Sequence, residues 1–505
     1  MTIPWLTVLG LLPIIGGVAL FFPMGRGAAR PLGMLFSLLT LGAGIGVAAM
    51  YFAGVNLDEQ VPWIRVIGAY WAHSLDGMGL AMVLMTVVLT PVVLLAEWKT
   101  SDTVSDWSSQ AFFALVLLLE GLAIFVFTAA DVLLFYLFFE ATLIPVYFLI
   151  AGFGGARRKY AAIKFLLFSL AGGLVMLASV IGLYVVSAGE GQPSYLLKDL
   201  AALQLDGNLG RWLMIGFLFA FIVKAPMVPV HTWLPDAAEN STPGTATLLV
   251  GVLDKIGTFG MIKFCLGLFG EASQWAANFM MILAAISVIW GAVAAIASKN
   301  MMRLVAYTSV SHFGLIVLGI YAFTTPSLTG SVFYMLNHGF STAALFLVVG
   351  FLINRRGTAD IAAFGGVQKV APVVAGVLMV SGLASLSLPG MSSFVSEFMV
   401  LAGSWANNPY VTIPALLGMV LSAVYILKLY QRSMTGPIRD EVAQAFEGND
   451  LNWLEKLVMV PLIGYLLFFG FLPNPAVKLV EPTAVAAMQS VGASDPAPQV
   501  EGVQP

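Results

Sequence analysis

Residues 224–237 of the chain read KAPMVPVHTWLPDA, and they interrupt an apolar segment that runs from residue 211 to residue 235. A proline inside a helix removes a hydrogen bond and clashes with the preceding turn, so Pro226 and Pro229 predict a broken helix. Lys224 lies two residues before Pro226. In a membrane, a broken helix is tolerated where its free backbone groups face protein or a water-filled cavity. The stretch therefore predicts a membrane protein with a polar interior at this break.

The composition of the whole chain agrees with this interpretation. Of 505 residues, 59% are hydrophobic, and the 23 basic and 26 acidic residues together make up only 10%. Soluble domains carry about 25% charged residues. The mean hydropathy is +0.93. These values exclude a soluble enzyme, a nucleic-acid-binding protein and a disordered chain, and they leave a polytopic membrane protein.

The apolar segments are long enough to cross a membrane many times. A helix crosses the ~30 Å hydrocarbon core in about 20 residues. The segment 372–405 is too long for one straight helix and contains LPG at 388–390, so a second broken helix is predicted at Pro389. Met1–Phe22 has no basic start or cleavage site and is expected to be a retained first span. The fourteen candidate spans are 3–22, 32–54, 78–97, 110–128, 131–151, 161–187, 211–235, 243–267, 275–297, 303–323, 330–353, 372–405, 410–431 and 455–473.

The basic residues between the spans predict the orientation. Inside loops of membrane proteins carry an excess of lysine and arginine, so both termini are expected on the outer face of the cell membrane. The fourteen inside residues are then Arg26, Arg30, Lys99, Arg157, Arg158, Lys159, Lys299, Arg303, Arg355, Arg356, Lys369, Arg432, Arg439 and Lys456, against four outside, Arg65, Lys198, Arg211 and Lys478.

The spans also suggest an internal duplication. Spans four to eight and nine to thirteen each form a five-helix unit, and the fourth helix of each unit is the broken one. Because five is odd, two copies of such a unit enter the membrane from opposite sides, as in the inverted repeats of many transporters. We therefore expect an all-α polytopic protein. Its parts are a three-helix segment (1–109), two inverted five-helix repeats (110–267 and 275–431), a C-terminal helix (432–480) and a disordered tail (481–505).

Several ionisable residues lie at mid-span depth, where a charge costs roughly 2.5–3.5 kcal/mol by insertion scales. A connected set of such groups, each able to gain or lose a proton, is what proton conduction requires. A Glu140–Lys224 pair could act as a switch, because bringing the two together favours both charged forms. The seven residues are Glu120, Glu140, Lys224, Lys255, His312, His338 and Glu397.

Structural roles remain open for some of these residues. Glu140 and Lys224 could form a purely structural ion pair, and either central histidine could be an ordinary core residue. His231 lies near a helix end and is expected to be structural or to lie at a proton-uptake site. Cys265 is the sole cysteine, so thiolate metal sites and iron–sulfur clusters are not expected, nor is any redox centre in this chain.

Five motifs together carry a resemblance to a known family. Residues 138–145 (FFEATLIP) resemble the glutamate helix of the antiporter-like subunits of respiratory complex I, NADH:quinone oxidoreductase. Residues 224–237 are similar to that family's broken helix, and residues 252–260 (VLDKIGTFG) to its lysine helix. Residues 303–312 (RLVAYTSVSH) and 337–339 (NHG) match as well, so the resemblance extends from about residue 70 to 430.

The resemblance implies a proton-translocating membrane subunit, packed beside other antiporter-like subunits and membrane lipids. NADH, FMN, iron–sulfur clusters and quinone are then expected elsewhere in the complex. Proton transfer is implied for Glu140, Lys224, Lys255, His312, His338 and Glu397, with Glu120, His231, Pro226 and Pro389 in support. Glu397, where sister subunits usually have lysine, favours one particular subunit of the three.

The chain departs from the family pattern at two places. The family commonly has a histidine and Glu-Ala-Pro after the Leu-Pro-Asp-Ala motif, whereas this chain reads AENSTP at 238–243. Asp254 replaces a usual apolar residue, and it points about 100° away from Lys255 if the segment is helical. The alternative function is a subunit of a multi-subunit cation/proton antiporter or a membrane-bound hydrogenase, which share this plan.

Overall fold

The structure is a computed structural model that describes residues 3–22, 28–99, 108–191, 193–203, 205 and 207–497. Within these ranges, eleven helices are long and apolar enough to cross a membrane, and two shorter apolar helices accompany them. The predicted all-α polytopic class is confirmed. The number of fourteen spans and the inverted repeat stay predictions. Arg26 and residues 498–505, which the sequence analysis placed in an inside loop and in the tail, lie outside the described residues.

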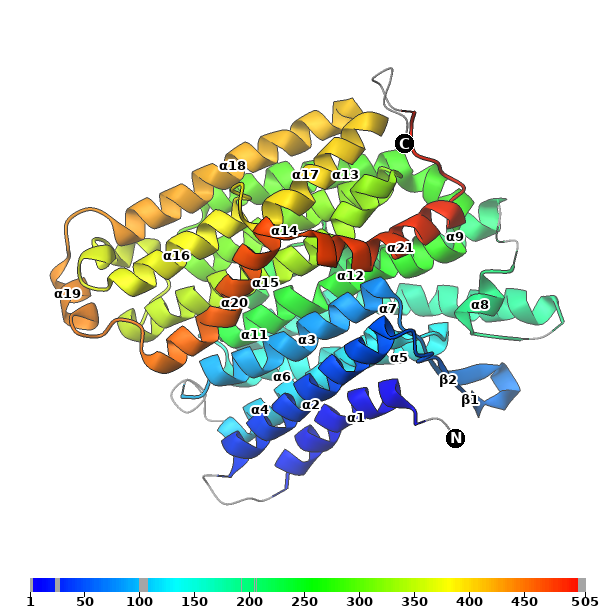
Figure 1. The fold of residues 1–505 in the computed structure, drawn as a ribbon, viewed down its shortest axis with the longest axis horizontal. Coiled ribbons are helices and arrows are strands. Elements are labelled where there is room, and N and C mark those ends of the chain that lie inside the picture. Colours follow the sequence, from blue (N-terminus) through cyan, green and yellow to red (C-terminus); the bar gives the residue numbers. More distant parts are fainter. Residues whose placement is uncertain are drawn as a thin grey trace.

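The long helices lie side by side in one bundle (Figure 1). The start of α1 and the whole of α21 lie toward the same end of this bundle as the β-hairpin (Figure 1). The first half of the chain forms α1 (Trp5–Leu20), α2 (Ala29–Phe52), α3 (Gly77–Ala96), α4 (Ser109–Thr128), α5 (Val132–Ala141), α6 (Leu143–Phe153), α7 (Arg158–Gly189), α8 (Leu197–Leu200), α9 (Gly207–Lys224) and α10 (Trp233–Glu239). The second half forms α11 (Pro243–Leu248), α12 (Lys255–Gly260), α13 (Gly270–Ala297), α14 (Met301–Tyr321), α15 (Thr325–Arg356), α16 (Pro372–Ser385), α17 (Ser392–Asn407), α18 (Pro409–Met434), α19 (Asp440–Phe446), α20 (Trp453–Phe471) and α21 (Asn474–Ser490).

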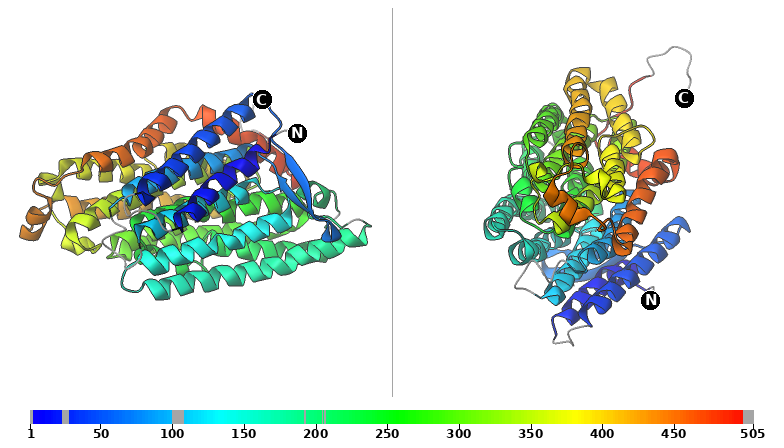
Figure 2. Two further views of the ribbon diagram at one scale, coloured as in Figure 1. Left: turned by 90° about the horizontal axis from the view of Figure 1, so that it is seen from below. Right: turned by 90° about the vertical axis from the view of Figure 1, so that its left-hand side faces the viewer.

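Helix α15 occupies the centre of the second half. It packs against α3, α11, α14, α16, α17, α20 and α21. Figure 2 shows the whole bundle from below and end-on. Helices α14 and α15 are 94% buried over their most apolar stretch, whereas α2, α18 and α20 are only 22–33% buried. Apolar side chains on the outer helices are expected in a bilayer, because lipid tails solvate them. The enclosed helices are therefore where polar groups can be kept from lipid.

Both predicted helix breaks are present. Helix α9 ends at Lys224, and a segment without regular helix separates it from α10, which begins at Trp233. The second break separates α16 from α17, and within it Gly390 has φ +95°. A left-handed backbone of this kind suits glycine, which has no side chain to clash. The prolines and glycine of the two motifs thus end helices where the sequence predicts.

The helix that carries Lys255 is irregular in a way that the sequence did not predict. The described segment passes from α11 into a π-helical turn (Leu249–Leu253), then into α12, and then into a second π-helical turn (Met261–Leu266). The amide of Asp254 donates to the carbonyl of Leu249, five residues back, at 3.0 Å. Single π turns within α-helices occur frequently at functional sites.

A two-stranded hairpin, β1 (Glu59–Ile64) and β2 (Ala69–His73), is an exception to the all-α prediction. Its stability comes from contacts with distant helices. The Glu59 carboxylate accepts from the amide of Leu6 at 2.6 Å, and Asp131 accepts from the amide of Tyr70 at 2.9 Å. These partners are remote in sequence, so local patterning could not reveal the hairpin.

The prediction of a disordered tail from residue 481 is wrong for its first part. Helix α21 continues to Ser490 and packs against α3 and α15. The composition is rich in proline and alanine, but its apolar residues recur every three or four positions and form one buried stripe. The stripe consists of Ala476, Val480, Ala484, Ala487 and Met488.

This stripe yields a testable expectation. Val480 is fully buried, whereas Val485 on the same helix is 40% exposed. Val480→Asp should lower the free energy of unfolding by about 3–5 kcal/mol, the cost of an uncompensated buried charge. Val485→Asp is the matched control and should change little. Thermal unfolding of the purified complexes measures both, and equal melting temperatures would contradict the docked position of α21.

Candidate functional site

The break after α9 holds Lys224 inside the protein. The indole Nε1 of Trp233 donates to the carbonyl of Val223 at 3.0 Å, and the amide of Val228 donates to Ser287 Oγ of α13 at 3.0 Å. These bonds satisfy backbone groups that the broken helix leaves free. The Lys224 side chain is 1% exposed. Its Nζ has no hydrogen-bond partner among the described residues, and it lies 5.3 Å from the ring centroid of Phe139.

Glu140 lies on α5 beside this lysine. Lys224 interacts with it electrostatically, but Glu140 Oε1 and Lys224 Nζ have no hydrogen-bond partner in the described part of the chain. The predicted pair is thus present as two separate neighbours. The Glu140 carboxylate packs directly on α7 at Gly173, where a Cβ atom would come within 1.6 Å of Oε1. Only glycine leaves room for the carboxylate there.

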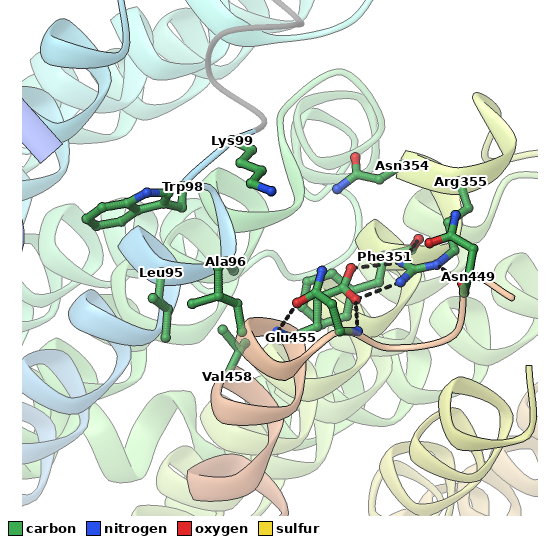
Figure 3. Close-up of a pocket in the computed structure, with 12 residues that line it drawn as sticks. Leu95, Ala96, Trp98, Lys99, Phe351, Asn354, Arg355, Asn449, Glu455 and Val458 are labelled. Atoms are coloured by element: carbon green, nitrogen blue, oxygen red, sulfur yellow. Dashed lines mark hydrogen bonds and ion pairs between the residues drawn. The ribbon is translucent and has the colours of Figure 1, made fainter. Parts of the chain in front are cut away.

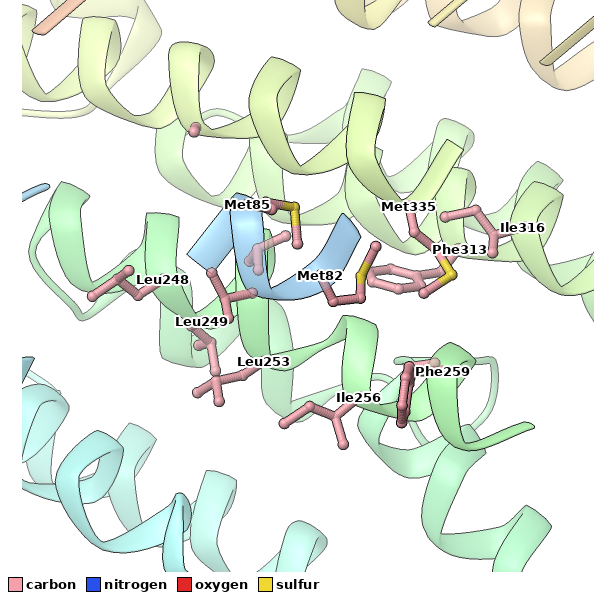
Figure 4. Packing of buried hydrophobic residues seen from close by; sticks show 14 of the residues in the cluster. Met82, Met85, Leu248, Leu249, Leu253, Ile256, Phe259, Phe313, Ile316 and Met335 are labelled. Carbon is pink, nitrogen blue, oxygen red and sulfur yellow. The ribbon is translucent and has the colours of Figure 1, made fainter. Parts of the chain in front are cut away.

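Lys255 has direct partners in the second half of the chain. It is fully buried, and its Nζ contacts the carbonyl oxygen of Val250 at 2.8 Å and His338 Nδ1 at 2.7 Å. The Nζ also lies 4.9 Å from the ring centroid of Phe313. Figure 4 shows buried apolar side chains of the same elements, among them Met82 and Met85 of α3, Ile256 of α12 and Phe313 of α14.

From His338 the contacts continue through α14 to α17. The rings of His338 and His312 have centroids 5.3 Å apart. His312 Nδ1 is hydrogen-bonded to the Tyr334 hydroxyl and lies 3.4 Å from Glu397 Oε1. The Tyr334 hydroxyl donates to Glu397. Because a hydroxyl has one proton, Tyr334 can donate to Glu397 only while it accepts from His312 Nδ1.

We use the name buried polar row for five neighbouring residues: Lys255, His338, His312, Tyr334 and Glu397. Helices α12, α15, α14 and α17 contribute its members, and each is at most 4% exposed. The structure thus brings together four residues that the sequence analysis named. Glu140 on α5 and Lys224 at the end of α9 lie outside the row, and the charged groups that act on Lys224 are Glu140 and Asp254.

The supporting residues occupy separate places. Glu120 on α4 is buried, with Thr90 of α3 beside it, and it makes no hydrogen bond to the row within the described residues. His231 lies in the break after α9, where its Nε2 accepts from Trp290 Nε1 at 3.1 Å. Pro226 lies in the same break, and Pro389 in the break between α16 and α17.

An ionic cluster closes the α10 end of the break. Asp236 is bonded to Lys164 Nζ at 2.6 Å and to Arg303 at 2.7 Å, and Arg303 also bonds Glu239 at 2.8 Å. Burial raises the pKa of Asp236, but the hydrogen bonds from Lys164 and Arg303 outweigh it and hold the pKa below the ordinary value. The cluster therefore fixes α10 to α7 and α14 with charged partners on both sides.

The sequence did not identify three residues of this region as site residues: Tyr334, Tyr425 and Asp254. Tyr334 precedes His338 by four residues on α15 and so lies on the same helix face. The Tyr425 hydroxyl lies 3.3 Å from His312 Nε2. Asp254 was noted only as a departure, but it is fully buried beside Lys255. The spacing of Tyr334 and His338 was the one available signal, and tyrosine in an apolar helix does not stand out.

A cavity of about 330 Å³ lies away from the row, at the ends of α3 and α15 (Figure 3). Its two charged residues from α15 and α20, Arg355 and Glu455, form a bidentate pair at 2.7 and 2.8 Å. Arg355 lies seventeen residues along α15 from His338, about 25 Å at the rise of an α-helix. The cavity therefore contains none of the residues of the row.

Comparison with known proteins places the chain in a family. The family described as NADH:quinone oxidoreductase/Mrp antiporter, TM, matches residues 129–422. The chain belongs to this family. The match spans Glu140 through Glu397, and so it contains the whole buried polar row together with Lys224.

Named relatives agree with the expected subunit. A protein named NADH-quinone oxidoreductase subunit M from Mycobacterium tuberculosis is 45% identical over 99% of this chain and 96% of its own length. A protein of the same name from Rhodobacter capsulatus is 35% identical over 86% of this chain and 85% of its own length. The predicted resemblance to the antiporter-like subunits is confirmed, and subunit M is the one that Glu397 favours among the three.

Solved structures show the same fold. A chain of respiratory complex I from Thermus thermophilus with bound NADH is 31% identical, with a TM-score of 0.88 over 97% of this chain and 100% of its own. A chain of the Mrp complex from Dietzia sp. DQ12-45-1b has a TM-score of 0.84 over 97% of this chain and 100% of its own, at 20% identity. The second likeness concerns the fold alone.

The ionic cluster at α10 yields a prediction about stability and pH. Asp236→Asn should lower the free energy of unfolding at neutral pH by about 1–3 kcal/mol, because charge-assisted bonds are lost. A depressed pKa contributes stability above the unfolded value of about 3.9, and this contribution fades as pH falls through the folded pKa. The difference between parent and variant should therefore shrink in acid.

Chemical unfolding followed at several pH values measures this difference. Glu441→Gln is the control, because Glu441 pairs with Arg356 but is 69% exposed, and exposed pairs contribute little. A pH-independent gap for Asp236→Asn would contradict the role of the Asp236 charge.

Proposed function

We propose that this chain is a proton-translocating membrane-arm subunit of NADH:quinone oxidoreductase. The observation that carries the proposal is the buried polar row, in which each member contacts the next from Lys255 to Glu397. Isolated charges in an apolar bundle are costly, and a contiguous set of titratable groups is what a proton path requires. The membership of the family and the named relatives support the same function.

The row can move a proton by short steps. Lys255 Nζ donates to His338 Nδ1 at 2.7 Å, and the His338 and His312 rings have centroids 5.3 Å apart. His338 Nε2 has no hydrogen-bond partner in the described part of the chain, so transfer from His338 to His312 needs a bridging water or a turn of one ring. His312 then donates through the Tyr334 hydroxyl to Glu397. Each transfer leaves its donor ready to accept the next proton, because the tyrosine hydroxyl gives one proton as it receives another. Glu397 is assigned the last step before release toward the outer side.

Glu140 and Lys224 are assigned the role of a switch. In the structure they are neighbours without a hydrogen bond, with Lys224 over the ring of Phe139. When the two side chains approach, each stabilises the charged form of the other. When they separate, Lys224 loses this support and gives up its proton more readily. In this assignment, the distance between Glu140 and Lys224 in the first half of the chain controls the protonation of Lys255.

Partners and surroundings follow from this assignment. The chain lies in the cell membrane with other antiporter-like subunits of the membrane arm beside it and lipid around it. Both termini are assigned to the outer face, supported by the shared end of α1 and α21 in the bundle (Figure 1) and by the basic residues of the opposite loops. The sites for NADH, FMN, iron–sulfur clusters and quinone are assigned to other subunits. For the clusters, the support is the single cysteine, because a cluster needs several.

The proposal predicts the effect of removing the acid at position 140. Glu140→Gln should assemble but lower NADH-driven proton pumping and quinone reduction together, by about tenfold or more, because an amide cannot take up the proton. Glu140→Asp should be milder, since it keeps the acid. Dye-reported acidification of inverted membrane vesicles measures pumping, with the exposed Glu190→Gln as control. Normal pumping in the assembled Glu140→Gln complex would remove this residue from the path.

A second prediction separates charge from proton release at Lys224. Lys224→Arg keeps a positive charge, but arginine has a pKa above 12 and does not release its proton. We expect this variant to assemble and yet pump poorly, whereas Lys198→Arg at an exposed site should pump normally. Parent-like pumping by Lys224→Arg would mean that a fixed charge suffices. Co-purification with NADH dehydrogenase activity tests the membership of the complex independently.

A further inference from the structure

Asp254 is a buried acid that the proposed path does not use. It lies between the first π turn and α12, and it is fully buried. Neither of its carboxylate oxygens has a hydrogen-bond partner within the described ranges. A buried carboxylate is costly unless it is compensated, so the charges around it must explain its presence. The cations that act on it are Lys255, its neighbour in the chain, and Lys224 of α9.

The packing of α12 places Asp254 on the side that faces α9. Gly257 lies three residues later, on the same helix face, and a Cβ atom there would come within 2.6 Å of the backbone nitrogen of Ala225. Ala225 directly follows Lys224 at the break. The close approach at Gly257 therefore brings the Asp254 face of α12 against the end of α9.

Lys255 points to a different neighbour. Its Nζ contacts His338 of α15 at 2.7 Å. A Cβ atom placed on Gly251, four residues earlier, would lie 3.5 Å from the carbonyl oxygen of Gly339, also on α15. Adjacent residues of a helix point about 100° apart. Asp254 and Lys255 thus connect two different surroundings, the break that holds Lys224 and the row that begins at His338.

We infer that Asp254 is a proton-carrying residue that connects Lys224 to Lys255, and so joins the two halves of the chain. This inference rests on the proposed function, and it adds a residue to the path between the switch and the row. It also explains why the oxygens of Asp254 are left without fixed partners. A relay group must exchange partners, and a carboxylate held by permanent hydrogen bonds could not.

The step balances in two transfers. The Lys224 ammonium gives a proton to the Asp254 carboxylate, which leaves a neutral amine and a carboxylic acid. The acid then gives its proton to the neutral Lys255 amine, which becomes an ammonium as Asp254 returns to a carboxylate. One proton has moved from Lys224 to Lys255. Because the groups lie beyond hydrogen-bond distance, transfer needs rotation of a lysine side chain or a bridging water.

The rival explanation is a fixed counter-ion that only balances the two lysines. The two roles differ in their pH dependence. Removing a fixed counter-ion makes the lysines release protons more readily, which shifts the pH profile of pumping but preserves its maximum. Removing a relay group lowers pumping at every pH. The test is therefore the rate of NADH-driven acidification of inverted vesicles, measured across a pH range on both sides of neutrality.

The variants are Asp254→Asn, Asp254→Leu and Asp254→Glu in the whole complex, with Thr258→Val as the control. Thr258 is buried on the same helix, and its hydroxyl bonds only the carbonyl of Lys255 in the described structure. We expect Asn and Leu to lower pumping by about tenfold or more at every pH. Glu, which keeps the acid, should restore most of the rate, and Thr258→Val should pump like the parent.

A pH profile that shifts without loss of its maximum would overturn the relay, and so would normal pumping by Asp254→Leu. If Asp254→Asn and Asp254→Leu fail to assemble, Asp254→Glu decides, since an assembled but inactive Glu variant also overturns it. Lys255→Ala, measured beside these, separates the two proposals. Loss of pumping in Lys255→Ala with normal pumping in Asp254→Leu rejects the Asp254 inference alone, whereas normal pumping in both rejects the proposed path.

Discussion

The cost of holding lysines away from water is the constraint on which this structure depends. Lys224 and Lys255 are at most 1% exposed, and lipid surrounds the bundle. Such a residue persists only if its surroundings supply partners. Lys255 obtains a backbone carbonyl and an imidazole, and Lys224 obtains aromatic faces and two nearby acids. Helix breaks and glycine contacts follow from this need, because they let polar atoms approach one another inside an apolar bundle.

The two lysines are held in different ways, and the difference suits the different roles proposed for them. Lys255 is held by two contacts shorter than 3 Å and is the first member of the buried polar row. The Nζ of Lys224 has no hydrogen bond in the described structure, and the two acids that act on its charge are Glu140 and Asp254. A side chain with fixed hydrogen bonds can pass protons along one path. A side chain without such bonds can move when its neighbours change. The arrangement places the responsive lysine before the fixed one.

The sequence predicted those features that local chemistry decides. Pro226 and Pro389 lie in the two helix breaks, although other prolines such as Pro91 and Pro414 lie inside continuous helices. A glutamate or lysine inside an apolar segment stands out without any alignment. The contacts between distant helices could not be predicted in this way. Tyr334 looks like any aromatic residue of a membrane helix until His312 and Glu397 are seen on either side of it. The hairpin and α21 were missed for the same reason, since both are held by residues far away in the chain.

The two π turns around α12 have a mechanical consequence. A π turn contains one more residue than the α turn it replaces, so converting one into the other rotates everything beyond it by about 100°. Because α12 has such a turn at each end, a gain of one residue at one end can be offset by a loss at the other. The seven residues between them, 254–260, can then turn about the helix axis while the outer ends of the span stay in place. Asp254 and Lys255 lie at one end of this short helical segment. The rotation of the segment about the helix axis therefore decides which neighbour each of the two side chains contacts.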